Sequence, residues 1–276
     1  MLSKMPELPE VEVTRMGVGP LLQGQKIQSI NIYHKQLRWP IKDELKSLAG
    51  QTISAVSRRA KYLIVQVEQV YVLIHLGMSG KLCVVDKSIA KQKHDHFEIV
   101  LTTGQALRLN DPRRFGAVLM FDEKSELDLW LAKLGPEPLS DDFNQQHLYK
   151  WTQKRQVAIK NCIMDNKVVV GVGNIYATES LFKSAIHPQT PANKLTQAQC
   201  AKLVDEIKLV LARAIKQGGT TLKDFAKADG KPGYFAQELL VYGRSGEKCK
   251  SCGSIIETMV IGQRASAYCP SCQPLL

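Results

Sequence analysis

The sequence predicts an α+β, multidomain protein: an N-terminal β-sandwich with flanking helices, then a helical domain, then a C-terminal module built on four cysteines. Three observations predict this class. Strand-like runs fill residues 26–121, helical periodicity dominates residues 144–217, and paired cysteines cluster near the C-terminus. A chain of 276 residues is long enough for two ordinary domains and a small module.

Composition narrows the class of partner. Hydrophobic residues make up 44% of the chain, which is enough for a core, and no apolar run has the length of a membrane helix. The N-terminus lacks the apolar stretch of a secretory signal, so we expect a cytoplasmic protein without a membrane partner. The net charge of +11 favours nucleic acid or an anionic membrane surface, although a merely basic enzyme surface has the same charge.

The first elements in chain order are one helix and a series of strands. Leu8, Val11, Val18 and Leu22 recur at helical spacing, and Pro9 suits a first turn, so residues 6–22 are predicted to be helical. The β-rich runs that follow alternate in polarity or are β-branched, and Gly, Asp or Pro interrupts them. We expect strands in the runs 26–33, 52–67, 70–85, 97–109 and 116–121.

The period changes in the second half of the chain. A helix is expected at residues 125–134, and the turn-forming stretch 135–142 is the best domain boundary. Residues 218–235 are rich in glycine and are interpreted as an ordered loop. Further helices are predicted at 144–153, 157–166, 174–184 and 196–217, the last with the clearest apolar stripe.

Four cysteines form a metal-binding pattern at the C-terminus. Cys249 and Cys252 make one C-x2-C pair, and Cys269 and Cys272 make a second. Four thiolates complete the tetrahedral shell of Zn²⁺, so the pattern predicts one structural zinc ion and no catalytic metal. A hairpin-like run joins the two pairs, with Arg264 near its tip. A guanidinium held there suits a phosphate, although a solvated surface arginine is the commoner interpretation.

Basic and apolar residues also gather in turns of the first half. Arg59 and Lys61 would share one face if the run 52–67 were a single strand, which suits a phosphate track or a solvated face. The turn 111–116 carries Arg113 and Phe115, and the turn 76–80 has Met78 at its tip. Met78 and Phe115 are either wedges between nucleic-acid bases or core residues, and periodicity alone favours the core.

Ten motifs follow one another along the chain: PELPEVE, RRAKYLIV, HLGMSG, KHDH, DPRRFG, LGPEPLSDDF, GVGNIYATESLF, QGGTTLKDF, DGKPGYFAQELLVYGR and the four-cysteine finger. Taken in order, they resemble the formamidopyrimidine-DNA glycosylase family over nearly the whole chain. The resemblance implies a β-sandwich, a helix–two-turn–helix domain and a zinc finger, with duplex DNA in the cleft between them. It implies domains at residues 6–137, 138–238 and 239–276, after an extension at 1–5 that is absent from the mature protein.

The same resemblance implies base-excision chemistry on oxidised purines in duplex DNA by a monomeric enzyme. Pro6, as the N-terminal residue, is the implied nucleophile, and Glu7 is the implied general acid/base. Lys61 is implied in β-elimination and Arg264 in phosphate binding and δ-elimination. On the residues alone, Pro6 and Glu7 are only a favourable helix start. The implied DNA contacts are His94, Arg113, Arg155, Asn174, Met78, Phe115 and Lys223.

The sequence departs from this pattern at its start, because Met1–Met5 precede Pro6. An internal proline has an amide nitrogen whose lone pair is delocalised and does not attack carbon. We therefore expect translation to begin at Met5 and Met5 to be removed. Two alternatives stay open: an endonuclease VIII-like enzyme for oxidised pyrimidines, and a non-catalytic DNA-binding relative in which Pro6 is not N-terminal.

Overall fold

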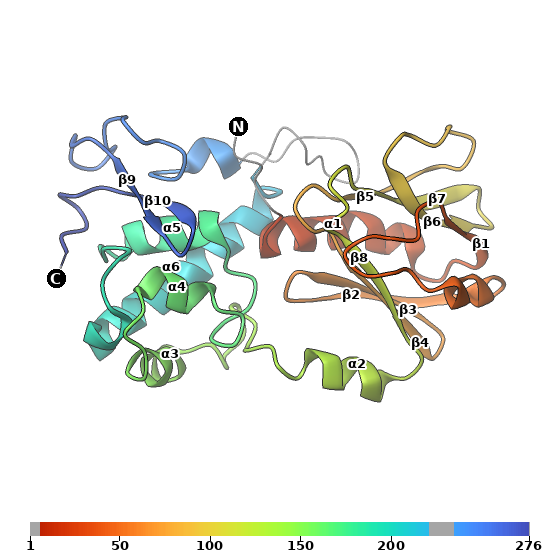
Figure 1. The fold of residues 1–276 in the computed structure, drawn as a ribbon, viewed down its shortest axis with the longest axis horizontal. Coiled ribbons are helices and arrows are strands. Elements are labelled where there is room, and N and C mark those ends of the chain that lie inside the picture. Colours follow the sequence, from red (N-terminus) through yellow and green to blue (C-terminus); the bar gives the residue numbers. More distant parts are fainter. Residues whose placement is uncertain (1–5, 221–234, 276) are drawn as a thin grey trace. The chain divides into compact units, whose positions relative to one another are not determined.

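The computed structural model describes residues 6–220 and 235–275, and its contacts divide the chain into two units (Figure 1). The first unit contains the described residues up to Ala132 together with Gly218–Thr220. The second contains Lys133–Gln217 and the described residues from Phe235 onward. The loop predicted at 218–235 therefore lies mostly outside the described residues.

Helix α1 (Leu8–Leu22) opens the first unit and confirms the first predicted helix. Glu7 is its N-cap in an extended conformation, and Glu7 and Glu10 form a reciprocal capping box. Pro9 lies in the first turn, where its missing N–H leaves no hydrogen bond unmade. The side chains of Val11, Val18 and Leu22 are buried in the sandwich core, which orients the helix.

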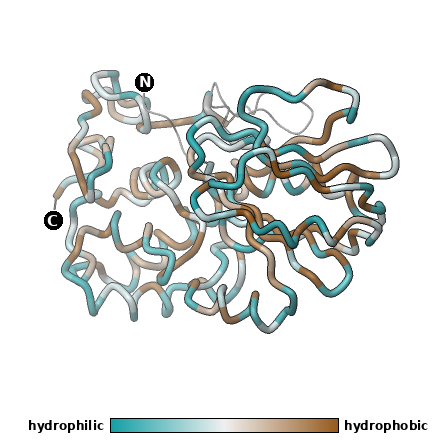
Figure 2. The backbone as a smooth tube through the Cα atoms, turned by 45° about the vertical axis from the view of Figure 1, so that its right-hand side comes forward, coloured by the Kyte–Doolittle hydropathy of each residue, from teal (hydrophilic) through white to brown (hydrophobic). Residues whose placement is uncertain are grey.

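Two antiparallel four-stranded sheets enclose that core. One sheet has the order β1-β6-β7-β5 and the other the order β2-β3-β4-β8. In Figure 2 hydrophobic stretches fall on the strands and helices, whereas many connecting loops are hydrophilic. The strands are β1 (Ile27–Ile32), β2 (Ile53–Arg59), β3 (Tyr62–Val67), β4 (Val70–His75), β5 (Lys81–Asp86), β6 (Asp95–Leu101), β7 (Gln105–Asn110) and β8 (Ala117–Phe121).

The run 52–67 forms two strands, not the single strand on which Arg59 and Lys61 would share a face. The chain reverses between β2 and β3, with Arg59 opposite Tyr62 in the register and Ala60 at a φ of 54°. Arg59 and Lys61 therefore do not share a face of one strand, because Lys61 lies in the turn. The runs 70–85 and 97–109 likewise each divide into two strands.

Two shorter helical elements complete the first unit. The 3-10 helix η1 (Asp43–Leu48) buries Leu45 and Leu48 in the sandwich core. Helix α2 (Lys124–Leu131) places Leu127 against Ile64 and Leu73, on the face of the β2-β3-β4-β8 sheet that points away from that core. The predicted helix at 125–134 is thus confirmed, with an earlier end.

The second unit contains a helical domain with its own core. A capping box between Thr196 and Gln199 starts the long α6, whose apolar stripe packs against α5. The four predicted helices of this region are confirmed. They are α3 (Gln145–Thr152), α4 (Ile159–Met164), α5 (Asn174–Lys183) and α6 (Gln197–Lys216), with short 3-10 turns η2 (Ala192–Lys194) and η3 (Phe235–Glu238).

The cysteine module follows η3 and is a two-stranded hairpin. Strands β9 (Glu257–Ile261) and β10 (Arg264–Tyr268) pair antiparallel, and β10 lies against α5. Sandwich, helical domain and cysteine hairpin together confirm the predicted fold class. Among the described helices, none is long and apolar enough to span a bilayer.

Candidate active site and nucleic-acid interface

The start of α1 is buried and held by hydrogen bonds. Pro6 is buried, and the Glu7 side chain is 3% exposed. The Glu7 backbone N–H donates to Glu10 Oε2 over 2.9 Å, which is one half of the capping box. Pro6 and Glu7, the two residues predicted to carry the chemistry, therefore lie at a fixed position, because the capping box holds the backbone at the start of the helix.

Glu10 is a candidate site residue that the sequence analysis missed. Its side chain is fully buried, and Oε1 accepts hydrogen bonds from the Thr220 backbone N–H (3.0 Å) and hydroxyl (2.8 Å). Gly219 has a φ of +78°, and a Cβ there would lie 3.2 Å from the same oxygen. One carboxylate thus links the segment that begins at Gly218 to the start of α1. The capping-box spacing predicts the contact of Glu10 with Glu7, but not its contacts with Thr220.

Lys61 and His75 set the electrostatics near the β2–β3 turn. Burial, together with the charges of Lys61 and Arg38, lowers the pKa of His75 to about 4. The ring is therefore neutral at pH 7, and its Nδ1 accepts the Gly77 N–H over 2.9 Å. The proton of the neutral ring then lies on Nε2. This bond fixes the start of the turn 76–80, in which Met78 is half-buried.

The turn 111–116 is built around the Asp111 carboxylate. Asp111 accepts the Gly116 N–H (2.7 Å) and the Ser79 hydroxyl (2.6 Å), which joins the two predicted turns. On the outside, the Arg113 guanidinium lies 4.9 Å from the centroid of the Phe115 ring, and Phe115 is 45% exposed. The core interpretation is therefore wrong for Phe115, which is presented with Arg113 on a rigid turn.

His94 lies beside this turn. Its carbonyl accepts the Asp111 backbone N–H over 3.0 Å, and its half-buried ring is 6.3 Å from that of His96. The structure thus gathers His94 and Arg113 around one loop of the first unit. Lys223, which the sequence analysis also gave as a DNA contact, lies outside the described residues.

In the second unit, two side chains hold the hairpin strand that carries Arg264. Lys160 is fully buried, and its Nζ donates to Ser266 Oγ (2.6 Å) and to the Ala265 carbonyl (3.2 Å). Asn174 donates its Nδ2 to the same carbonyl over 3.1 Å. Arg264 itself is exposed. Sequence reasoning missed Lys160, because a lysine in a predicted helix is expected to be solvated.

Two of the predicted DNA contacts, Asn174 and Arg155, differ in whether their polar atoms have partners. Asn174 is the first residue of α5, and its Oδ1 is buried without a hydrogen bond among the described residues. Arg155 pairs with Asp165 over 2.7 Å and lies 4.7 Å from the Trp151 ring centroid. The structure holds the Arg155 guanidinium in place, so a phosphate would have to share it with Asp165.

The four cysteines fit a tetrahedral metal. Their sulfurs lie within 4.8 Å of one another, with Cys252 and Cys269 at 3.4 Å and Cys249 and Cys272 at 4.0 Å. Ligand sulfurs around zinc lie about 3.8 Å apart, given Zn–S bonds of about 2.3 Å. The Gly253 N–H donates to the Cys249 carbonyl, which closes the turn of the first pair. The donor set is closed and suits a structural ion.

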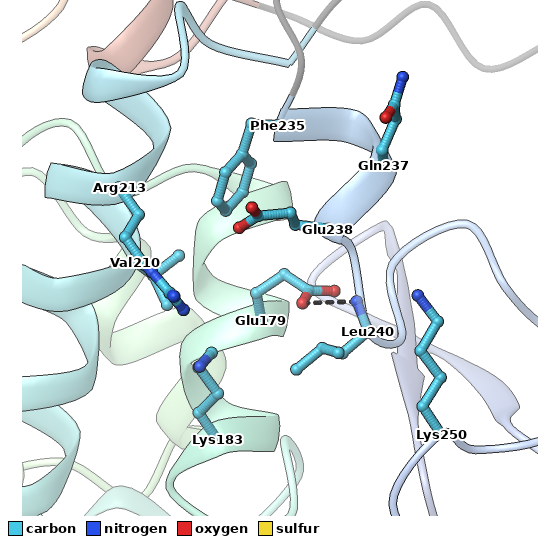
Figure 3. Close-up of a pocket in the computed structure, with 9 residues that line it drawn as sticks. All are labelled: Glu179, Lys183, Val210, Arg213, Phe235, Gln237, Glu238, Leu240 and Lys250. Carbon is cyan, nitrogen blue, oxygen red and sulfur yellow. Dashed lines mark hydrogen bonds between the residues drawn. The ribbon is translucent and has the colours of Figure 1, made fainter.

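A buried carboxylate fastens this module to the helical domain. Glu179 of α5, 2% exposed, accepts the backbone N–H groups of Leu240 (2.9 Å), Val241 (3.0 Å) and Tyr242 (2.8 Å). Figure 3 shows the bond to Leu240. Burial raises the pKa of the Glu179 carboxyl, and the three donors oppose that shift. Beside it lies a cavity of about 380 Å³, with Lys183 among its lining residues.

We expect Glu179→Ala to lower the free energy of unfolding by roughly 3 kcal/mol or more, because each buried N–H left without an acceptor costs about 1–3 kcal/mol. Glu179→Gln keeps one acceptor oxygen and should lose less. Hydrogen exchange at the amides of Leu240, Val241 and Tyr242 measures the effect locally. Unchanged protection in the alanine variant would contradict this role.

These features define a class first: a two-unit nucleic-acid-binding protein with a cysteine finger. Family models then match residues 5–118 (formamidopyrimidine-DNA glycosylase N-terminal domain), 134–226 (the H2TH domain of the same glycosylase) and 246–275 (zinc finger found in FPG and IleRS). The chain belongs to the formamidopyrimidine-DNA glycosylase family.

Individual relatives agree with the family models. The chain is 55% identical to the formamidopyrimidine-DNA glycosylases of Pasteurella multocida and Vibrio atlanticus, with 98% of this chain and 99% or 100% of each relative aligned. Among solved structures it is similar to Lactococcus lactis Fpg with abasic-site DNA (TM-score 0.91, 34% identity, 98% of this chain and all of that one). A Fapy-dG complex of that protein matches with a TM-score of 0.90, at 34% identity over 97% of this chain and all of the other.

Proposed function

We propose that this protein excises oxidised purines, 8-oxoguanine and formamidopyrimidines, from duplex DNA and then cuts the abasic site. The observation that carries the proposal is the buried Pro6–Glu7 start of α1, which Glu10 links to Thr220. Relatives over the whole chain are named as formamidopyrimidine-DNA glycosylases, and similar structures hold Fapy-dG or abasic-site DNA. Each unit then supplies part of one reaction.

Pro6 acts as the nucleophile once its nitrogen is a terminal amine. A terminal α-amine has a pKa of about 8, so a useful fraction is neutral at pH 7 without further burial. The nitrogen lone pair forms a bond to C1′ while the bond from C1′ to the damaged base breaks. The base leaves with that electron pair and takes up the proton that the nitrogen releases. The family model begins at Met5, which supports a mature chain that starts with Pro6.

Glu7 protonates the sugar ring oxygen as the ring opens to the iminium intermediate. A carboxyl group that is nearly buried and adjacent to the nucleophile is well placed for proton transfer. We expect Glu7→Gln to slow base excision roughly 10²–10⁴-fold, the range typical of a lost general acid, while DNA affinity changes little. Single-turnover excision of 8-oxoguanine measures this effect. A variant within threefold of the parent rate would assign the proton to another group.

The lyase steps follow from the same iminium. It makes the C2′ proton acidic, and loss of that proton breaks the C3′–O bond; a second elimination breaks the C5′–O bond. We assign Lys61 to proton transfer in the first elimination and Arg264 to phosphate binding in the second. Lys61 lies in the β2–β3 turn, close enough to His75 to lower its pKa, and Arg264 is exposed on the hairpin.

Arg264→Ala tests the assignment on the finger. Loss of one phosphate contact should reduce the slope of log K against log salt by about 0.9 and should slow strand cleavage. Lys250→Ala, on the same module and with the same charge change, is the matched control and should leave cleavage unchanged. An equal effect of both variants would mean that only the net charge of the module matters.

The remaining contacts divide by chemistry. Arg113 and Phe115 fill and wedge the stack where the lesion is extruded, with Met78 beside them. His94, Arg155 and Asn174 bind the phosphate backbone, and Lys223 acts in the segment over the flipped base.

One structural zinc ion is held by Cys249, Cys252, Cys269 and Cys272. The enzyme acts as a monomer in the cytoplasm.

Substrate choice is tested by comparing duplexes with 8-oxoguanine opposite cytosine and duplexes with thymine glycol. Faster excision of 8-oxoguanine supports the purine assignment. Faster excision of thymine glycol would favour the endonuclease VIII-like alternative. Tight binding without any excision, even by a chain that begins with Pro6, would favour a non-catalytic DNA-binding protein.

A further inference from the structure

The turn 111–116 carries two adjacent arginines that have different partners. Arg113 stacks on Phe115, whereas Arg114 Nη1 lies 2.8 Å from His34 Nε2. Arg114 adopts a φ of +58°, a left-handed conformation that is uncommon outside glycine. Arg113 and Arg114 therefore point to different partners. A contact that holds Arg114 at His34 leaves Arg113 and Phe115 as the pair that the turn exposes.

His34 is itself fixed against the frame of the turn. The backbone N–H groups of Tyr33 and His34 both donate to the His96 carbonyl, and the His34 ring lies edge-on to that of His96 at 5.3 Å. His96 Nε2 donates to the Asp111 carbonyl over 2.9 Å. A continuous series of contacts therefore runs from Asp111 through His96 and His34 to Arg114. It ends on the turn where it began, because the Arg114 backbone N–H donates to the Asp111 carbonyl.

The chemistry of the His34 ring makes this contact conditional. A guanidinium only donates, so Nε2 must accept, and the proton of the neutral ring must lie on Nδ1. The Gln36 backbone N–H, however, lies 3.1 Å from Nδ1 and needs an acceptor there. A neutral imidazole has one lone-pair nitrogen. The contacts with Arg114 and Gln36 are therefore alternatives, and each selects one tautomer.

We propose that His34 is a positioning residue for DNA binding: its Nδ1–H tautomer holds Arg114, so that the turn presents the Arg113–Phe115 pair alone. The inference rests on the proposed function where it assigns that pair to DNA. The 2.8 Å contact to Arg114 is shorter than the 3.1 Å contact to Gln36, which favours this tautomer. A guanidinium also provides the stronger, charge-assisted bond.

The tautomer is measured first, without DNA. Nitrogen-15 NMR of the histidine rings distinguishes a protonated Nδ1 from a protonated Nε2, and His34→Gln assigns the His34 signals by their loss. We expect the proton on Nδ1 in the free protein and a shift of the His34 signals in Arg114→Ala. A proton on Nε2 in the parent would overturn the proposal, whatever the protein does to DNA.

A double-mutant cycle on the affinity for abasic-site DNA tests the consequence. His34→Leu and Arg114→Ala should each weaken binding roughly three- to tenfold, and the double variant should lose no more than either alone, because one contact is removed in all three. His34→Gln, which keeps a neutral acceptor, should restore most of the affinity. Lys35→Ala, next in sequence and outside the contact, is the control and should bind like the parent. Additive losses at His34 and Arg114 would overturn the proposal.

The cycle needs only binding, so it is independent of catalysis. A parent protein that binds DNA but does not excise bases contradicts the proposed function. The binding cycle still tests the His34 proposal in that case. A parent that excises bases while the two losses are additive contradicts the His34 proposal alone.

Discussion

A chain that keeps Met1–Met5 attached to Pro6 is expected to bind damaged duplex and leave it uncut. An acylated proline nitrogen has no available lone pair, so neither the covalent intermediate nor the eliminations that follow from it can form. Loss of the nucleophile should reduce excision by roughly 10³-fold or more. Met5→Leu in a chain that begins at Met1 gives this form, because it removes the second start.

The matched control is a chain whose translation begins at Met5. Intact mass of each protein establishes which residues precede Pro6, and single-turnover excision of 8-oxoguanine gives the rates. Equal DNA affinity in the two forms would assign the loss to chemistry. Normal excision by the extended form would mean that Pro6 is not the nucleophile.

Removal of zinc is expected to unfold the cysteine module and abolish tight DNA binding. Structural zinc supplies about 10–16 kcal/mol in comparable fingers, which exceeds the stability of a small hairpin. Two of the four expected ligands lie on the buried side of the module, since Cys249 and Cys269 are 3% and 0% exposed. Without the metal, we expect the hairpin to unfold despite the contacts of Lys160 and Asn174 with β10, and Arg264 to lose its fixed position.

Cys269→Ser and a strong chelator should give the same result, measured as loss of hydrogen-exchange protection at Ala267 and Tyr268 together with weaker DNA binding. Cys83→Ser is the control, because Cys83 lies on β5 and outside the four-cysteine cluster. Protection and affinity that survive chelation would show that the hairpin folds without metal.

Periodicity predicted most of the secondary structure but missed the reversal between β2 and β3, whereas the turn predicted at 76–80 does separate β4 from β5. The turn at Ala60–Lys61 contains no Gly, Pro, Asn or Asp, so the local pattern had no signal that would divide the run 52–67. Ala60 adopts its positive φ because the pairing of β2 with β3 imposes it. Tertiary context decided this turn against local propensity.

The candidate site was predictable where its residues share a short motif. The cysteine spacing alone predicted a four-thiolate cluster, and the sulfurs do converge. Glu10 was missed because its partner Thr220 is 210 residues away. Lys160 was missed because composition assigns lysine to the surface, whereas its ammonium is satisfied by Ser266 and Ala265, 106 and 105 residues further on. Such contacts require the fold.

In the proposed reaction, the nitrogen of Pro6 takes the sugar carbon from the departing base. Borohydride reduction during reaction with an 8-oxoguanine·cytosine duplex converts an iminium into a stable protein–DNA link, and peptide mapping then identifies the linked residue. We predict a single adduct on Pro6, at the N-terminus of a chain that lacks Met1–Met5. An adduct on Lys61 or another lysine, or on a chain that still carries those five residues, would contradict the account.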